Sequence, residues 1–221
     1  MVSLVLEFIK KELKIEWRNK YALNGILLYL VSTIFICYLS FNVKSNQLNV
    51  VTWNALFWII ILFASINAVA KSFIQEKQER LLYYYTIISP QALIFARIMY
   101  NALLLILVAL LGFFFYSIIL GNPVITTWLF LAIILLASVG FSSTLTLISA
   151  IASKAGNNQT LMAVLGFPII LPMLLMVIKV SKNAIDGLAL SASLDELITL
   201  LAINIIVGAV SFLLFPYLWR S

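Results

Sequence analysis

Six long apolar runs limit what this chain can fold into more than any other feature of its sequence. Each run is near or above the ~20 residues that a helix needs to cross the hydrocarbon core of a bilayer. Backbone groups inside a bilayer must satisfy their own hydrogen bonds, and the alternation of a membrane β-barrel is missing, so we predict six helices. The runs lie at residues 22–41, 51–70, 98–120, 127–152, 160–178 and 197–218.

The composition agrees with a chain that is embedded in lipid. Hydrophobic residues make up 64% of the chain and charged residues 10%, whereas a soluble domain is about half apolar and about a quarter charged. The net charge of +6 could suggest nucleic acid, but the basic residues flank the apolar runs. That placement fits anionic lipid and control of topology better. We therefore predict an all-α membrane protein with one transmembrane domain over residues 1–221, in contact with the lipid bilayer and not with nucleic acid.

Several kinds of chemistry need residues that this sequence lacks. It has no histidine, and its single cysteine, Cys37, lies within an apolar run. Histidine-based triads, imidazole ligation of metal or haem, and disulfides within the chain are therefore excluded. The sequence also lacks a GxxxxGK[ST] phosphate loop and a GxSxG elbow, which ATP-binding proteins and serine hydrolases use. We expect no enzyme activity, no catalytic or metal site and no directly bound cofactor.

The basic residues predict the orientation of the spans. With the N-terminus inside, eleven of the 14 basic residues fall on the inner side, and only Lys44, Lys179 and Lys182 fall outside. Cytoplasmic segments of membrane proteins carry such an excess of lysine and arginine. Because the number of spans is even, both ends of the chain are predicted to lie in the cytoplasm.

Residues 1–20 are predicted to form an amphipathic helix at the membrane surface. Apolar residues recur there at spacings of three and four, and charged residues follow the same rhythm on another face. The five basic residues of this stretch suit the membrane surface, and a solvated helix that packs on protein is the alternative. The apolar face consists of Val2, Leu6, Ile9, Leu13 and Trp17, and the charged face of Glu7, Lys11, Lys14 and Arg18.

A polar segment at residues 71–90 separates the second run from the third. Its charges are Lys71, Glu76, Lys77, Glu79 and Arg80. Each would cost roughly 2.5–3.5 kcal/mol at the centre of a bilayer, so the segment should lie in water. Such a charged segment between two spans is suited to contact a soluble partner, which we expect to be an ATPase.

The same segment ends in a signal for a helix start. Serine at residue 89 can cap free backbone N–H groups, and proline at residue 90 loses no hydrogen bond in the first helical position. A helix over residues 90–120 would be roughly 46 Å long at 1.5 Å per residue. Because the hydrocarbon core is only about 30 Å thick, the first turns should project into the cytoplasm. A rigid helix of this kind could pass on a force that is applied to the segment.

Polar residues within the spans predict contacts between helices. In the fourth run, Ser138, Ser142, Thr146 and Ser149 share a face, which favours a packing seam over a substrate track. Asn67 and Asn204 are lone polar residues at membrane depth, and each is expected to form a hydrogen bond with a neighbouring helix.

The fifth run carries two prolines four residues apart. Pro168 and Pro172 remove backbone hydrogen bonds and should kink the helix, and Gly166 adds backbone flexibility. The kink is either a hinge or a shape that packs well. The loop that follows, residues 180–196, is predicted to lie outside and to contain a short surface helix.

Three local patterns, taken together, resemble the haem exporter protein B (CcmB) family, the permease subunits of the ABC-type complex in cytochrome c maturation. The resemblance covers nearly the whole chain. The first pattern is the acidic-basic rhythm from Glu12 to Arg18 ahead of the first span. The second comprises Phe73, Glu76, Leu81-Leu82 and Ser89-Pro90, and Arg80 stands where many members have a glycine. The third comprises the turn Lys154-Ala155-Gly156, followed by Pro168 and Pro172.

The resemblance implies a dimer of this chain with two copies of a separate ABC ATPase subunit in the bacterial inner membrane. Segment 71–90 would be a coupling helix that docks on the ATPase. Its coupling residues would be Phe73, Glu76, Glu79, Arg80, Leu82, Ser89 and Pro90, and the hinge candidates would be Gly166, Pro168 and Pro172. Further implied partners are a haem-handling membrane subunit and a haem chaperone, with haem as a candidate cargo.

Two alternatives stay open at this stage. The more general layout is similar to ABC-2 exporter permeases, whose cargo could be a lipid, a glycan or a drug. The other alternative is a subunit that transmits the motion of an ATPase to a partner and transports nothing itself. Within the CcmB interpretation, ATP hydrolysis could drive either haem export or release of the haem-loaded chaperone.

Overall fold

The structure, a computed structural model, describes residues 7–12, 14, 21–42, 48–74, 89–154 and 159–220. All regular secondary structure in these residues is helical. Six of the helices are long and apolar enough to cross a membrane, so the prediction of an all-α protein with six spans is confirmed. The elements are α2 (Tyr21–Asn42), α3 (Val50–Ile74), α5 (Pro90–Leu120), α6 (Thr127–Lys154), α7 (Gln159–Ile185), the 3₁₀ helix η1 (Leu190–Ser193) and α8 (Leu194–Arg220).

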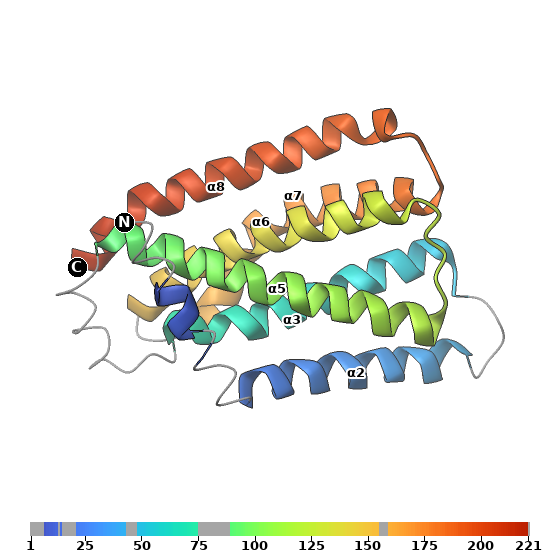
Figure 1. Ribbon diagram of the computed structural model, residues 1–221, viewed down its shortest axis with the longest axis horizontal. Coiled ribbons are helices and arrows are strands. Elements are labelled where there is room, and N and C mark those ends of the chain that lie inside the picture. The colour runs from blue at the N-terminus through green and yellow to red at the C-terminus, as the bar shows by residue number, and fades with distance from the viewer. Residues whose placement is uncertain are drawn as a thin grey trace.

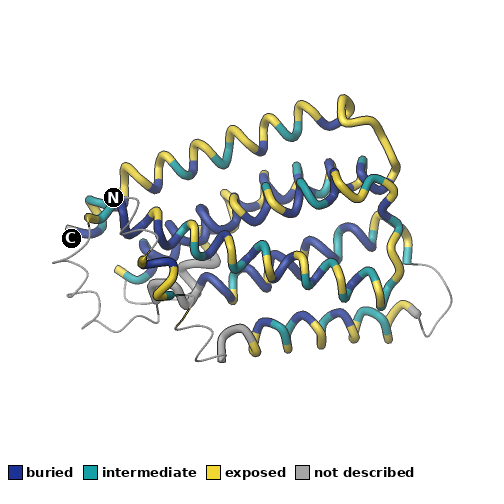
Figure 2. Tube along the Cα trace, viewed as in Figure 1, coloured by how far each residue is buried: buried dark blue, intermediate teal, exposed yellow. Residues whose placement is uncertain are grey.

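The long helices lie side by side and alternate in direction (Figure 1). We call the end of the bundle where α5 begins the proximal end, and the end where α5 finishes the distal end. Helix α6 is the most enclosed, since 72% of its membrane-crossing stretch is buried, compared with 17% in α2 and 11% in the stretch that includes α8. The outer face of α8 is exposed along most of its length (Figure 2). The bundle is therefore built around α6, with α2 and α8 at its edges.

Helix α5 begins where the sequence predicted. Ser89 is its N-cap, and the Ser89 side chain accepts a hydrogen bond from the backbone N–H of Ala92 at 3.4 Å. Pro90 occupies the first helical position, and Gly121, with φ of +83°, follows the last residue. A positive φ is the conformation in which glycine carries no steric penalty. At 31 residues, α5 is longer than the bilayer core requires.

Six aromatic side chains form a cluster in the distal half of the bundle. Their ring centroids are 4.8 to 6.2 Å apart, and such pairs contribute roughly 0.5–1.5 kcal/mol each beyond the area they bury. The members are Trp53, Phe57, Trp58, Phe113, Tyr116 and Phe130. Their polar atoms are used as well: Trp53 Nε1 donates to the carbonyl of Gly121 at 3.0 Å, and the Tyr116 hydroxyl donates to the carbonyl of Trp53 at 3.0 Å. The cluster ties α3, α5 and α6 together.

The hydroxyl-bearing face of α6 is a packing seam, as predicted. Ser138, Ser142, Thr146 and Ser149 are all buried. The Ser142 hydroxyl donates to the carbonyl of Ile98 at 2.7 Å, and Asn101 Nδ2 donates to Thr146 Oγ1 at 2.8 Å. Small hydroxyl residues allow this close approach of α5 to α6.

Only one of the two asparagines that were expected to bond across helices does so. Asn204 Nδ2 donates to the carbonyl of Leu136 at 3.0 Å, which links α8 to α6. Asn67 is exposed instead, and no hydrogen bond joins it to another described residue. For Asn67 the prediction is therefore wrong within this single chain.

Helix α7 extends seven residues beyond the predicted end of the fifth run at residue 178. The polar residues after that point suggested a loop over 180–196, but α7 continues to Ile185. The helix continues because its polar side chains face partners: Ser181 is fully buried and accepts a hydrogen bond from Trp58 Nε1 at 2.7 Å. The predicted short surface helix is present as η1.

Replacing Trp58 with phenylalanine should destabilise the bundle, because it removes the donor that bonds to Ser181. Hydrogen bonds between membrane helices contribute about 0.6 kcal/mol on average and up to ~1.7. We expect a loss in this range or above it, measured as the free energy of unfolding in mixed micelles. Trp128→Phe is the matched control, because Trp128 is exposed at the distal end. Equal stability of the two variants would show that the Trp58–Ser181 bond is not needed.

Candidate functional site

The segment that the sequence singles out is anchored on two helices at the proximal end. Phe73 lies in the last turn of α3, and Ser89 and Pro90 form the start of α5. Residues 75–88 lie outside the described residues, and with them Glu76, Glu79, Arg80 and Leu82. The structure thus places the two ends of the segment at the same end of the bundle (Figure 1).

A small hydrophobic cluster surrounds the start of α5, separate from the main core. It joins four parts of the chain: the N-terminal segment 7–14, the first two turns of α5, the last turns of α6 and the last turns of α8. Its members are Phe8, Ile9, Ala92, Leu93, Ile94, Ala96, Ala150, Phe215 and Trp219. We call this group the proximal cluster. Any displacement of the start of α5 acts directly on it.

Phe8 lies at the charged edge of the proximal cluster. The guanidinium carbon of Arg97 is 5.9 Å from the centroid of the Phe8 ring, and Lys11 Nζ is 5.5 Å from it. Arg97 is itself buried, and Glu12 of the same N-terminal segment supplies an opposite charge to it. Cation–π contacts are worth roughly 0.5–1 kcal/mol when exposed and about 2 when desolvated. The N-terminal segment is therefore held on α5 by both packing and electrostatics.

The first turns of α5 are covered by other parts of the chain, although the sequence suggested that they project beyond the lipid. Ala92, Leu93 and Ile94 are buried, because the N-terminal segment and the end of α8 cover them. Packing of the N-terminal segment on protein was the alternative in the sequence analysis, and Phe8, which contributes to this cover, falls outside the apolar face inferred from helical spacing.

The N-terminal segment is described only over residues 7–12 and 14, where it is helical. Phe8 and Ile9 are buried against protein, whereas Glu7, Lys10 and Lys14 are exposed. Of the predicted apolar face, Val2, Leu6, Leu13 and Trp17 lie outside the described residues. Contact with protein is thus present, and a position at the lipid surface stays a prediction.

The three hinge candidates lie together on α7 and none belongs to the proximal cluster. Pro168 and Pro172 are exposed within a helix that continues through both. Gly166 is buried, but a Cβ built on it would meet its nearest neighbours, Ile148 Cδ1 and Ile170 Cδ1, at 3.4 Å. That is ordinary contact, so packing does not require a glycine there.

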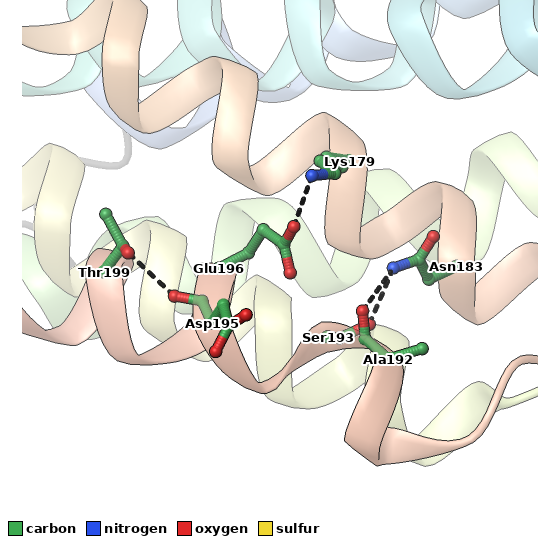
Figure 3. A network of polar contacts seen from close by, with 7 residues as sticks. All are labelled: Lys179, Asn183, Ala192, Ser193, Asp195, Glu196 and Thr199. Carbon is green, nitrogen blue, oxygen red and sulfur yellow. Dashed lines mark hydrogen bonds and ion pairs between the residues drawn. The ribbon is translucent and has the colours of Figure 1, made fainter.

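A polar network joins α7 to η1 and α8 at the distal end (Figure 3). Lys179 Nζ lies 2.5 Å from Glu196 Oε1, and Asn183 Nδ2 donates to Ser193 Oγ at 2.9 Å. In the described residues, no three histidine, cysteine or acidic side chains gather in a way that could hold a metal ion. The network's groups bind one another, so its role is to fix the helix ends.

Comparison with protein families gives one match that covers most of the chain. The family is described as CcmB protein, and the matched region is residues 3–215. It includes the N-terminal segment, segment 71–90, the proline pair of α7 and nearly all of α8. Comparison with curated proteins gives no match, and comparison with solved structures gives none either.

Proposed function

Since the chain belongs to the CcmB family, the haem exporter B family of cytochrome c maturation ABC transporters, we propose that segment 71–90 couples it to the ABC ATPase of that system. The protein is a multi-pass membrane protein and the permease subunit of the haem-export ABC system. ATPase activity is expected to reside in the partner subunit, because this chain carries no phosphate loop.

The observation that carries the proposal is the charge cluster between two membrane spans. Lys71 lies in the last turns of α3, beyond the membrane-crossing stretch that ends at Val69, and Glu76, Lys77, Glu79 and Arg80 follow between α3 and α5. Five charges cannot lie within hydrocarbon at reasonable cost. A soluble ATPase can contact only parts of the chain that lie outside the lipid, as this segment does. We place segment 71–90, both termini and the whole proximal end in the cytoplasm, in agreement with the distribution of basic residues.

Helix α5 is suited to transmit a movement of the segment. It starts one residue after Ser89, its first turns belong to the proximal cluster, and it contacts α2, α3, α6 and α8. A push on the start of α5 would therefore reach most of the bundle. We propose that two copies of the chain pair in the bacterial inner membrane and act with a haem-handling subunit and a haem chaperone, with haem as cargo.

One observation favours a second candidate function, that of an assembly subunit that transports nothing. The hydroxyl-bearing face of α6 formed by Ser138, Ser142, Thr146 and Ser149 is buried, and Ser142 and Thr146 form hydrogen bonds with α5, so this face supplies no polar track for a cargo. In that case ATP hydrolysis would drive release of the haem-loaded chaperone. An ABC-2 exporter of a lipid, glycan or drug would instead be recognised by its co-purified cargo.

Charge reversal in segment 71–90 tests the coupling. The triple variant Glu76→Lys, Glu79→Lys and Arg80→Glu should insert normally but lose most of the ATPase that co-purifies with it in mild detergent. Exposed charge pairs contribute only ~0.2–1 kcal/mol each, which is why all three are changed together. Mass spectrometry identifies the partners, and an absorption spectrum detects haem.

The matched control exchanges one charge pair at the distal end. Lys179→Glu combined with Glu196→Lys keeps the ion pair but reverses it, and this variant should retain the ATPase. Undiminished co-purification of the ATPase with the triple variant would overturn segment 71–90 as the docking element.

A further inference from the structure

Helix α7 is held in the bundle very unequally along its length. From residue 173 to residue 185 its buried side chains are Met173, Leu174, Val177, Val180, Ser181, Ala184 and Ile185. From residue 164 to residue 172, only Gly166 and Ile170 are buried. The distal half of α7 therefore packs over a broad face, and residues 164–172 pack along a narrow edge.

One row of side chains shows where the contact ends. Phe167, Leu174 and Ser181 follow one another at intervals of seven residues and so lie on nearly the same face of the helix. Their exposed fractions are 52%, 9% and 0%. The face that is closed at Ser181 and Leu174 is thus open at Phe167, two turns nearer the proximal end.

Specific bonds fix the distal half to its neighbours. Asn54 Nδ2 of α3 donates to the carbonyl of Ile178 at 2.8 Å, and Trp58 Nε1 of α3 donates to Ser181 Oγ at 2.7 Å. The pair Lys179–Glu196 adds a link to α8 (Figure 3). The backbone N–H of Thr126, just before α6, donates to the carbonyl of Ala184 at 2.9 Å.

The two prolines lie at the boundary between these parts. Neither can donate the helical hydrogen bond to the residue four positions earlier, so the helix is weakened over one turn of its length. Their side chains are exposed, so they fill no slot in the bundle, which argues against a purely packing role. We infer that α7 bends at Pro168 and Pro172, with residues 173–185 fixed and residues up to 167 swinging relative to α3.

The bend is a property of this chain alone. Only the expectation that nucleotide bound to the partner ATPase changes the bend rests on the proposed function. Two spin-label pairs, each bridging α3 and α7, measure it in the full-length protein with Cys37→Ser. The proximal pair uses Phe63→Cys and Val164→Cys, and the distal pair uses Val51→Cys and Lys182→Cys; all four native side chains are exposed. Double electron–electron resonance spectroscopy gives the distribution of distances between the two labels of each pair.

We expect the distance distribution of the proximal pair to be roughly twofold broader than that of the distal pair. Helix motions on the μs–ms timescale populate several positions, and freezing the sample traps these positions as different distances. Pro168→Ala with Pro172→Ala restores both hydrogen bonds and should narrow the proximal distribution to the distal width. Equal widths in the parent protein, or a proximal width that the alanines leave unchanged, would overturn the inference.

With the ATPase bound, trapped nucleotide should shift the mean distance of the proximal pair and leave that of the distal pair unchanged. A broad proximal distribution with no such shift would contradict the coupling while supporting the bend.

Discussion

Replacing Gly140 with leucine is expected to force α7 and α8 away from α6 and to destabilise the protein severely. A Cβ atom at Gly140 would lie 2.1 Å from Met173 Cε and 2.3 Å from Asn204 Oδ1. Both side chains would have to move, and Asn204 could no longer donate to the carbonyl of Leu136. Overpacking costs roughly 1–3 kcal/mol and the lost bond about 0.6–1.7. We therefore expect a total loss of about 2–5 kcal/mol.

The measurement is the free energy of unfolding in mixed micelles, with a second glycine as the control. Gly208 lies on α8, and a Cβ built on it meets no atom within 4 Å. Gly208→Leu should therefore leave stability nearly unchanged, and Gly140→Ala should fall between the two leucine variants. If Gly140→Leu is as stable as Gly208→Leu, then α6, α7 and α8 do not meet at Gly140.

Replacing Phe8 with alanine is expected to release the N-terminal segment from the start of α5. Truncation of a buried phenylalanine costs roughly 3–5 kcal/mol, and the contacts with Arg97 and Lys11 are lost with the ring. Because the proximal cluster is separate from the main core, the loss should stay local. Amide hydrogen exchange over residues 7–12 should become faster by ~10²-fold or more, while exchange over residues 105–116 of α5 should not change.

Phe8→Leu is the matched variant, because it keeps a large apolar side chain in the cluster. It should retain most of the protection over residues 7–12. Lys10→Ala, which changes an exposed residue of the same segment, should have no effect. Slow exchange in Phe8→Ala, as in the parent protein, would mean that Phe8 does not hold the segment.

The positions of the helices could be predicted from the sequence because their causes are local. A run of about 20 apolar residues has no other stable form in a bilayer. The start of α5 was predictable to the residue, since Ser89 and Pro90 act within the first turn. The serine face of α6 was predictable as well, because hydroxyl residues stand out against apolar neighbours.

The inward face of each helix could not be predicted in the same way. In a membrane protein the lipid-facing side chains are as apolar as the core, so the sequence shows no contrast between the two. Trp53 and Trp58 are buried in the aromatic cluster, whereas Ile59 and Phe63 of the same helix are exposed, although all four lie in one apolar run. The central position of α6 was hidden for the same reason.

The misplaced end of α7 shows the opposite error. Lys179, Ser181 and Asn183 suggested water, but each side chain is bound by a partner on another helix, at least ten residues away in the sequence. The buried Asn54 and Asn101 were missed in the same way, although a lone asparagine in an apolar run was the available signal. For Glu76, Glu79, Arg80 and Leu82, the assignment to coupling stays a prediction from the sequence and the family.

The central claim is that segment 71–90 touches the ATPase subunit, and site-specific photocross-linking tests it most directly. A photoreactive phenylalanine analogue replaces Leu82 in the segment or, as control, the exposed Trp128 at the distal end. After irradiation of intact cells, the Leu82 variant should yield one adduct that contains a P-loop ATPase, and the Trp128 variant should yield none. An ATPase adduct from Trp128, or none from Leu82 and its neighbours in the segment, would contradict the account.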